Sequence, residues 1–164
     1  MLNRPLQRKA KKLTLDQAKQ KALRYCAYQE RSHQEVKNKL FELGIQSSVV
    51  DELLVYLITE GFLNEERFAK VFAGGKFRIK KWGRIKITRA LESKGLTKNC
   101  IRIGLKEIEE TDYHQALEDL LTSKIASLQE SNVFVTRDKA SKYAIQHGYE
   151  PDLVWDKLRK LLPE

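Results

Sequence analysis

The segment that decides the fold is residues 84–108, RIKITRALESKGLTKNCIRIGLKEI. Its apolar residues recur at spacings of three and four, which is typical of one face of an amphipathic helix. Gly95 interrupts this pattern, and a glycine there supplies the left-handed residue that commonly ends a helix. Thr97 follows as a residue whose hydroxyl can cap the next helix. The segment therefore predicts two helices joined at Gly95.

The same pattern recurs around Gly44 and Gly148, so the glycines are spaced by 51 and 53 residues. A period of this length is typical of arrays of supersecondary units, each of which needs its neighbours to bury its apolar face. Apolar residues stand eight and four positions before each glycine and six and ten positions after it. These are Val36, Leu40, Val50 and Leu54, then Ile87, Leu91, Ile101 and Leu105, then Ala140, Ala144, Val154 and Leu158.

A further amphipathic stretch precedes each pair of helices, so we predict an all-α fold of nine helices in three tandem three-helix repeats. The repeats are expected over residues 15–61, 62–110 and 111–164. Residues 1–14 are basic at their start and lack apolar periodicity, which predicts a flexible basic arm.

Local signals predict where several helices begin. Ser32 and Glu35 have the spacing of a capping box. We expect Ser47 or Ser48 to cap the following helix, and Thr136 to cap the helix before Gly148. Residues 133–135, Val-Phe-Val, are interpreted as part of a loop at 127–136 that inserts into the core.

Composition and motifs argue against several classes of function. The 164 residues hold no apolar run long enough to span a membrane, and the basic start lacks the apolar region of a secretory signal. Cys26 and Cys100 lie within helical patterns and are interpreted as small buried hydrophobic residues in a cytoplasmic protein. No phosphate-binding loop, HExxH or CxxC motif occurs, and the three histidines are far apart. We therefore predict no enzyme, no metal site and no cofactor.

Positive charge is concentrated in residues 76–106, which contain eleven Lys and Arg residues and one acid, Glu92. This segment has a net charge of +10, whereas the rest of the chain sums to −1. A solvated helix face usually mixes both signs, so a surface for a polyanion or an acidic partner is favoured over solubility alone. The predicted binding residues are Lys76, Lys80, Lys81, Arg84, Lys86, Arg89 and Arg102.

Two aromatic residues, Phe77 and Trp82, lie between these cations. They could form a platform on which bases stack. Aromatic residues at a corner between two helices are more often packing residues, so packing is the favoured interpretation, although the sequence leaves both open.

Three stretches resemble the RecX family, the bacterial regulators of the RecA recombinase. Residues 31–36, RSHQEV, with Leu40 and Gly44, are similar to the opening motif of that family. Residues 57–69 are similar to the second motif of the family, although Asn64 stands where the family usually has Asp. The third motif of the family is similar to the pattern formed by Gly83, Ile87, Leu91 and Gly95. The resemblance is clear over residues 20–110 and weaker over 111–164.

The resemblance implies an elongated, curved array that binds along the groove of the RecA–DNA filament as a monomer. It also implies inhibition of recombination, ATP hydrolysis and co-protease activity during DNA repair and the SOS response. Binding to single- or double-stranded DNA alone would be weak. The alternative function is a stand-alone nucleic-acid-binding protein, because each helix triplet resembles helix-turn-helix geometry.

Overall fold

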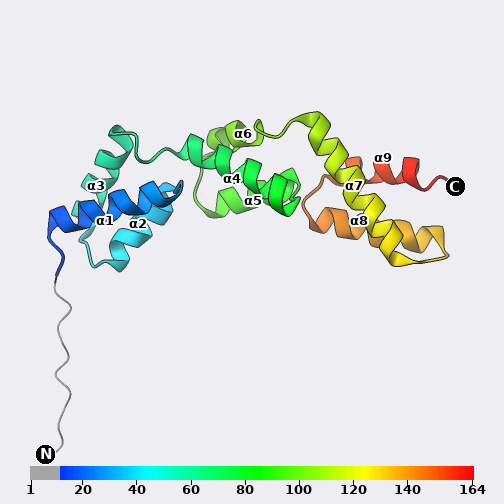
Figure 1. Ribbon diagram of the computed structural model, residues 1–164, viewed down its shortest axis with the longest axis horizontal. Helices are drawn as coiled ribbons and strands as arrows, with labels where there is room; N and C mark the ends of the chain where they lie inside the picture. Colours follow the sequence, from blue (N-terminus) through cyan, green and yellow to red (C-terminus); the bar gives the residue numbers. More distant parts are fainter. Residues whose placement is uncertain (1–11) are drawn as a thin grey trace, which may run out of the picture. The chain divides into compact units, whose positions relative to one another are not determined.

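The computed structural model describes residues 12–164, so most of the predicted arm at 1–14 lies outside the described residues. Within the described range the chain forms nine α-helices and no strand, which confirms the all-helical prediction (Figure 1). The helices are α1 (Leu15–Tyr28), α2 (His33–Glu42), α3 (Ser47–Thr59), α4 (Glu65–Lys80), α5 (Arg84–Ser93), α6 (Lys98–Leu105), α7 (Glu110–Leu128), α8 (Val133–Gln146) and α9 (Pro151–Leu161). None of these helices is both long and apolar enough to cross a membrane.

The chain divides into two compact units, Met1–Asn64 and Glu65–Glu164. In the first unit, α1, α2 and α3 contact one another and enclose their own apolar core. In the second unit, α4 contacts α5 and α6, and α7 contacts α8 and α9, around one continuous core. The second and third helix triplets thus share a hydrophobic core.

The repeating glycines have the predicted conformation. Gly44, Gly95 and Gly148 follow the ends of α2, α5 and α8 with φ of 78°, 80° and 98°. In each case the next amide donates to the carbonyl five residues back, as Ile45 does to Leu40 at 3.1 Å. This pattern is the Schellman motif, which satisfies carbonyls that the helix end leaves unpaired.

Burial follows the predicted register closely. The residues eight and four positions before each glycine are completely buried in all three copies. Ten positions after it, Leu158 is completely buried, whereas Leu54 and Leu105 are only partly buried. The repeat therefore identifies the inner face of the helix before each glycine more accurately than that of the helix after it.

Two predictions of helix starts are right. The Ser32 hydroxyl accepts a hydrogen bond from the Glu35 amide at 3.1 Å, and the Glu35 carboxylate accepts one from the Ser32 amide at 2.9 Å. Thr97 Oγ1 accepts from the Cys100 amide at 3.2 Å and caps α6.

Two other predicted starts are wrong. Neither Ser47 nor Ser48 caps α3, since its N-cap is Gln46, which makes no capping bond with its side chain. Thr136 does not cap α8 either, because Asn132 Oδ1 accepts from the Phe134 and Val135 amides and starts that helix one turn earlier.

The interpretation of residues 133–135 as a loop inserted in the core is therefore also wrong. They form the first turn of α8 and face solvent, and Phe134 is 72% exposed. An Asn cap is as favourable as any, so it outweighs the β-propensity of the three residues that follow it.

Candidate nucleic-acid interface

All seven predicted binding residues lie in the second unit. Lys80, Lys81, Arg89 and Arg102 are exposed, whereas Lys76, Arg84 and Lys86 are half-buried. The two sets have different surroundings, because the half-buried cations contact aromatic rings or carboxylates. Their contacts show which cations are brought together.

Trp82 brings Lys76 and Lys86 together. The Lys76 ammonium lies 4.9 Å from the centre of the indole ring, and the Lys86 ammonium lies 4.7 Å from it. The negative face of an indole ring attracts cations at such distances. One half-buried aromatic ring thus holds two lysines that come from different helices.

The contacts continue along α4. Lys76 also lies 5.3 Å from the ring of Phe72, which stacks on Phe68 with ring centres 5.7 Å apart. The Lys94 ammonium lies 5.8 Å from the Phe72 ring. We call this arrangement the basic–aromatic row, and its members are Lys86, Trp82, Lys76, Phe72 and Lys94.

The end of α4 explains how Trp82 reaches this place. Lys81 has a φ of 59°, in the left-handed region that non-glycine residues rarely adopt. Its amide donates to the Phe77 carbonyl at 3.0 Å, and the Trp82 amide donates to the Lys76 carbonyl at 3.3 Å. The backbone therefore folds back at Lys81 and returns Trp82 to the turn of α4 that contains Lys76.

The sequence left open whether Phe77 and Trp82 stack or pack, and the two residues differ. Phe77 is only 7% exposed and lies 5.9 Å from the ring of Tyr113, so it belongs to the core. Trp82 is half-buried, and lysines lie over its ring. Only Trp82 of the pair retains a surface that a ligand could reach.

Arg84 has a different environment from the lysines. Its Nη1 lies 2.5 Å from Glu110 Oε1, its Nε lies 2.8 Å from Glu150 Oε1, and its guanidinium lies 4.0 Å from the Tyr113 ring centre. Burial disfavours the charged guanidinium, but the hydrogen bond to Glu110 and the charge of Glu150 raise the pKa of Arg84 overall. Two carboxylates therefore balance the Arg84 charge.

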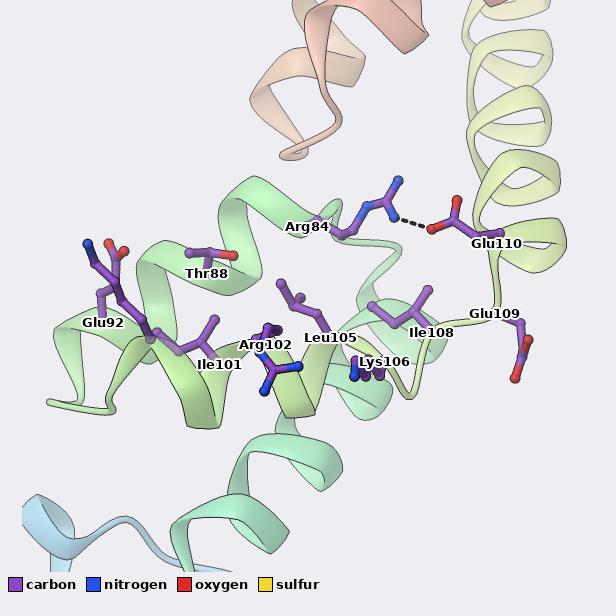
Figure 2. A pocket seen from close by; sticks show the side chains of 11 residues that line it. Arg84, Thr88, Glu92, Ile101, Arg102, Leu105, Lys106, Ile108, Glu109 and Glu110 are labelled. Carbon is purple, nitrogen blue, oxygen red and sulfur yellow. Dashed lines mark hydrogen bonds and ion pairs between the residues drawn. The ribbon is translucent and has the colours of Figure 1, made fainter.

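Arg84 and Arg102 also line a hollow of about 650 Å³ beside α5 and α6. Figure 2 shows Arg84 directed toward Glu110 at the start of α7. The apolar part of the lining comes from Ile101, Leu105 and Ile108. On its rim the Arg102 guanidinium donates to Asn99 Oδ1 at 2.7 Å. The cations thus divide into those of the row, those of this hollow, and the exposed Lys80, Lys81 and Arg89.

The predicted site omitted Phe72 and Lys94, which the structure places in the row. A signal for Phe72 is present in the sequence, since Phe68, Phe72 and Lys76 are spaced by four residues and share one face of α4. Lys94 has no comparable signal, because it follows the end of α5 and only the packing of α4 and α5 brings it to Phe72.

A metal site or a site built on histidine has no comparable support in residues 12–164. No group of three or more His, Cys, Asp or Glu side chains in that range could hold a metal ion. His147 Nδ1 lies 2.9 Å from the Tyr143 carbonyl, and His114 lies 3.7 Å from Glu110. Both contacts lie within four residues along a helix, so they are local.

Two regions of the chain match models of known domains. Residues 18–57 match RecX, first three-helix domain, and residues 64–105 match RecX, second three-helix domain. Together these regions make up about half of the chain. They correspond to α1–α3 and to α4–α6.

Relatives of known name extend the similarity beyond residue 105. The chain is 29% identical over 146 residues to the regulatory protein RecX of Lactobacillus johnsonii, covering 88% of this chain and 54% of that protein. It is 28% identical over 142 residues to the regulatory protein RecX of Pelodictyon phaeoclathratiforme, covering 86% of each. The chain spans about half the length of its relatives from Lactobacillus johnsonii and Lactobacillus gasseri.

The fold is similar to that in the crystal structure of RecX from Lactobacillus salivarius. The TM-score is 0.82 at 20% identity, and the match covers 90% of this chain and 96% of that chain. The two domain matches, the named relatives and the ordered motifs around Gly44 and Gly95 agree with one another. The chain therefore belongs to the RecX family of regulatory proteins.

Proposed function

We propose that the chain binds the RecA–DNA filament and inhibits its recombinase, ATPase and co-protease activities. Membership of the RecX family supports RecA as the target, since the relatives are named regulatory proteins. The observation that supports binding to the filament is the basic–aromatic row, in which two lysines lie within 5 Å of the centre of one indole ring. The chain itself acts without catalysis.

The row has the chemistry of a site for a nucleic-acid strand. Its lysines can neutralise phosphates and release counterions, which is the main source of affinity for DNA. Its aromatic members can contact bases or sugars where a strand is exposed. Lys80, Lys81 and Arg89 are exposed and extend the positive charge from α4 to α5.

The filament offers two surfaces to such a protein, the phosphates of DNA and the RecA subunits around it. Each lysine at the protein surface contributes little by itself, so binding to bare DNA is weak and depends strongly on salt. A monomer that contacts protein and DNA together gains affinity from both. Its proposed place of action is the cytoplasm.

The proposal includes a third repeat made of α7, α8 and α9. Its support is the shared register, because Ala140 and Ala144 are as deeply buried before Gly148 as Ile87 and Leu91 are before Gly95. A curved, elongated array of the three repeats stays a prediction, and small-angle X-ray scattering of the purified protein tests it.

Titration against a filament assembled beforehand tests the function. We expect substoichiometric protein to slow DNA-dependent ATP hydrolysis by RecA, because one bound molecule perturbs many subunits when it blocks a growing end. DNA length and salt concentration are varied independently. Inhibition that follows DNA coverage alone, with no effect on an assembled filament, would instead support the stand-alone nucleic-acid-binding protein.

Charge reversal tests the positive surface on α5. We expect Lys86→Glu with Arg89→Glu to weaken filament binding strongly at low salt while the helix content stays unchanged. The matched control is Arg159→Glu with Lys160→Glu, which makes the same change in charge at exposed positions of α9. Equal affinities of the two double variants would remove Lys86 and Arg89 from the mechanism.

A further inference from the structure

The helix that carries Lys86 has no N-terminal cap of its own. The N-cap of α5 is Gly83, which has no side chain to accept from the first amides. Helix α2, at the same place in the first repeat, is capped by the neighbouring Ser32 and Glu35. The first amides of α5 must find acceptors elsewhere, since unpaired buried amides are costly.

The third helix triplet supplies acceptors for three of these amides, those of residues 83–85. The Gly83 amide donates to the His147 carbonyl at 2.8 Å, and the Ile85 amide donates to the Gly148 carbonyl at 2.9 Å. Between them, the Arg84 amide donates to the Tyr113 hydroxyl at 3.0 Å. The carbonyl end of α8 thus meets the amide end of α5, which also aligns the two helix dipoles favourably.

The backbones at this junction touch. A Cβ atom on Gly83 would lie 2.2 Å from the Gly148 carbonyl carbon, and a Cβ on Gly148 would lie 2.3 Å from Lys86 Cβ. Both positions therefore require glycine. Gly148 lies directly against Lys86, whose ammonium belongs to the basic–aromatic row.

Side chains close the junction around the same backbone. The Tyr113 hydroxyl donates to Glu150 Oε2 at 2.6 Å while it accepts from the Arg84 amide. Glu150 Oε1 in turn accepts from Arg84 Nε at 2.8 Å. Tyr113 is completely buried, so its hydroxyl depends on these partners.

We propose that Tyr113, Gly148 and Glu150 are positioning residues for the basic–aromatic row. They hold the backbone at residues 83–85, which lies between Trp82 and Lys86, and thereby keep the Lys86 ammonium at the Trp82 ring. The third triplet controls the binding surface of the second triplet without contributing a cation to it. The consequence for binding rests on the function proposed above, whereas the positioning itself can be measured without any ligand.

The test compares Tyr113→Phe and Glu150→Gln with the unchanged protein, each in a Trp155→Phe background so that Trp82 is the only tryptophan. Hydrogen exchange of the amides at residues 83–85 and the emission of Trp82 are recorded without ligand. Loss of one hydrogen bond implies exchange of the Arg84 amide that is faster by about three- to tenfold in Tyr113→Phe. We expect a shift of Trp82 emission in both variants, while core amides such as that of Leu117 keep their protection.

Tyr143→Phe is the matched control, because it removes a hydroxyl from α8 that forms no part of the junction and should leave both signals unchanged. Affinity is then measured for a labelled single-stranded oligonucleotide, bare and coated with RecA. We expect both junction variants to bind several-fold more weakly than the control, with a smaller dependence on salt as Lys86 leaves its position.

The outcomes separate the two proposals. Unchanged exchange at residues 83–85 and unchanged Trp82 emission in both variants would overturn the positioning proposal, whatever the affinities are. Altered exchange and emission with unaltered affinity would support positioning and remove the row from the proposed function. If the unchanged protein binds neither probe, the proposed function fails, and exchange and emission still decide whether the junction positions the row.

Discussion

Equivalent glycines of the repeat share a backbone conformation but have different steric surroundings. Gly44 and Gly148 occupy the same position and both have positive φ, 78° and 98°. A Cβ atom on Gly44 would meet nothing within 4 Å, whereas one on Gly148 would meet Lys86. The repeat therefore reports the backbone conformation of each glycine but not the space around it.

Substitution by alanine should separate the cost of the left-handed backbone conformation from the cost of steric overlap. We expect Gly44→Ala to lower the free energy of unfolding by about 1–2 kcal/mol, the cost of the left-handed conformation for a residue with a Cβ. Gly148→Ala should cost clearly more, because the added atom also forces two backbones apart. Urea unfolding of both variants measures the difference, and equal costs would show that the α8–α9 turn moves away freely.

Two buried tyrosines should make the stability depend on alkaline pH. Burial and the hydrogen bond to Glu150 raise the pKa of Tyr113, and burial with the charge of Glu150 raises the pKa of Tyr149 to about 12. The unfolded chain releases these protons at pH about 10. We therefore expect the contribution of the two tyrosines to the free energy of unfolding to be constant below pH 9 and to fall from pH 10 to about 12.

The measurement is the free energy of unfolding in urea, determined between pH 8 and pH 11 in steps of one pH unit. Tyr149→Phe should flatten the decrease and should not lower stability at neutral pH, since the Tyr149 hydroxyl is buried without a hydrogen-bond partner among the residues described. Tyr28→Phe is the control, because Tyr28 is 83% exposed. A decrease as steep in Tyr149→Phe as in Tyr28→Phe would contradict the assignment.

At the scale of elements, the start of a helix is decided by competition between possible caps. Ser32 caps α2 effectively because the Glu35 carboxylate, three residues later, accepts a hydrogen bond from the Ser32 amide in return. Asn132 and Thr136 both have capping side chains, and the earlier residue begins α8. Thr136 then lies inside the helix, where its hydroxyl donates to the Asn132 carbonyl at 3.0 Å.

A pair of serine variants measures this effect in the first unit. We expect Ser32→Ala to lower the free energy of unfolding by about 0.5–2 kcal/mol, since it removes a cap. Ser48→Ala should change it by no more than about 0.5 kcal/mol, because Ser48 is exposed and does not cap α3. Thermal unfolding of the two variants tests the contrast, and a larger loss in Ser48→Ala would show that the cap assignment is reversed.

At the scale of the whole molecule, the second unit contains two helix triplets that depend on each other. Its core runs from Phe68 on α4 to Leu158 on α9. The third triplet also caps α5 through His147, Gly148 and Tyr113. The second triplet should therefore be unable to fold fully without the third.

Fragments test this dependence. We expect a fragment of residues 65–164 to keep its helix content and to unfold cooperatively, because its core lies entirely within it. A fragment of residues 65–109 should lose most of its helix, since it exposes part of that core and leaves the first amides of α5 without acceptors. Circular dichroism during heating is the measurement, and a cooperative transition in the shorter fragment would contradict the dependence.

The sequence by itself determined that the described residues are helical, where the helix before each repeating glycine ends, and which face of that helix is buried. These features depend on residues within about five positions of one another, as in the bond from the Ile45 amide to the Leu40 carbonyl. The order and spacing of the same local motifs also indicated the family. The concentration of cations in residues 76–106 was equally visible without the structure.

Only the tertiary structure decided which of those cations lie near one another. Arg84 meets Glu150, 66 residues away in the chain, and its charge is balanced there, whereas Lys76 and Lys86 meet at Trp82. The cap of α5 comes from residues near 147, and Phe77 is buried while Trp82 is not. These outcomes depend on contacts between helices distant in the chain, and no local pattern records which charges and backbone groups such packing brings together.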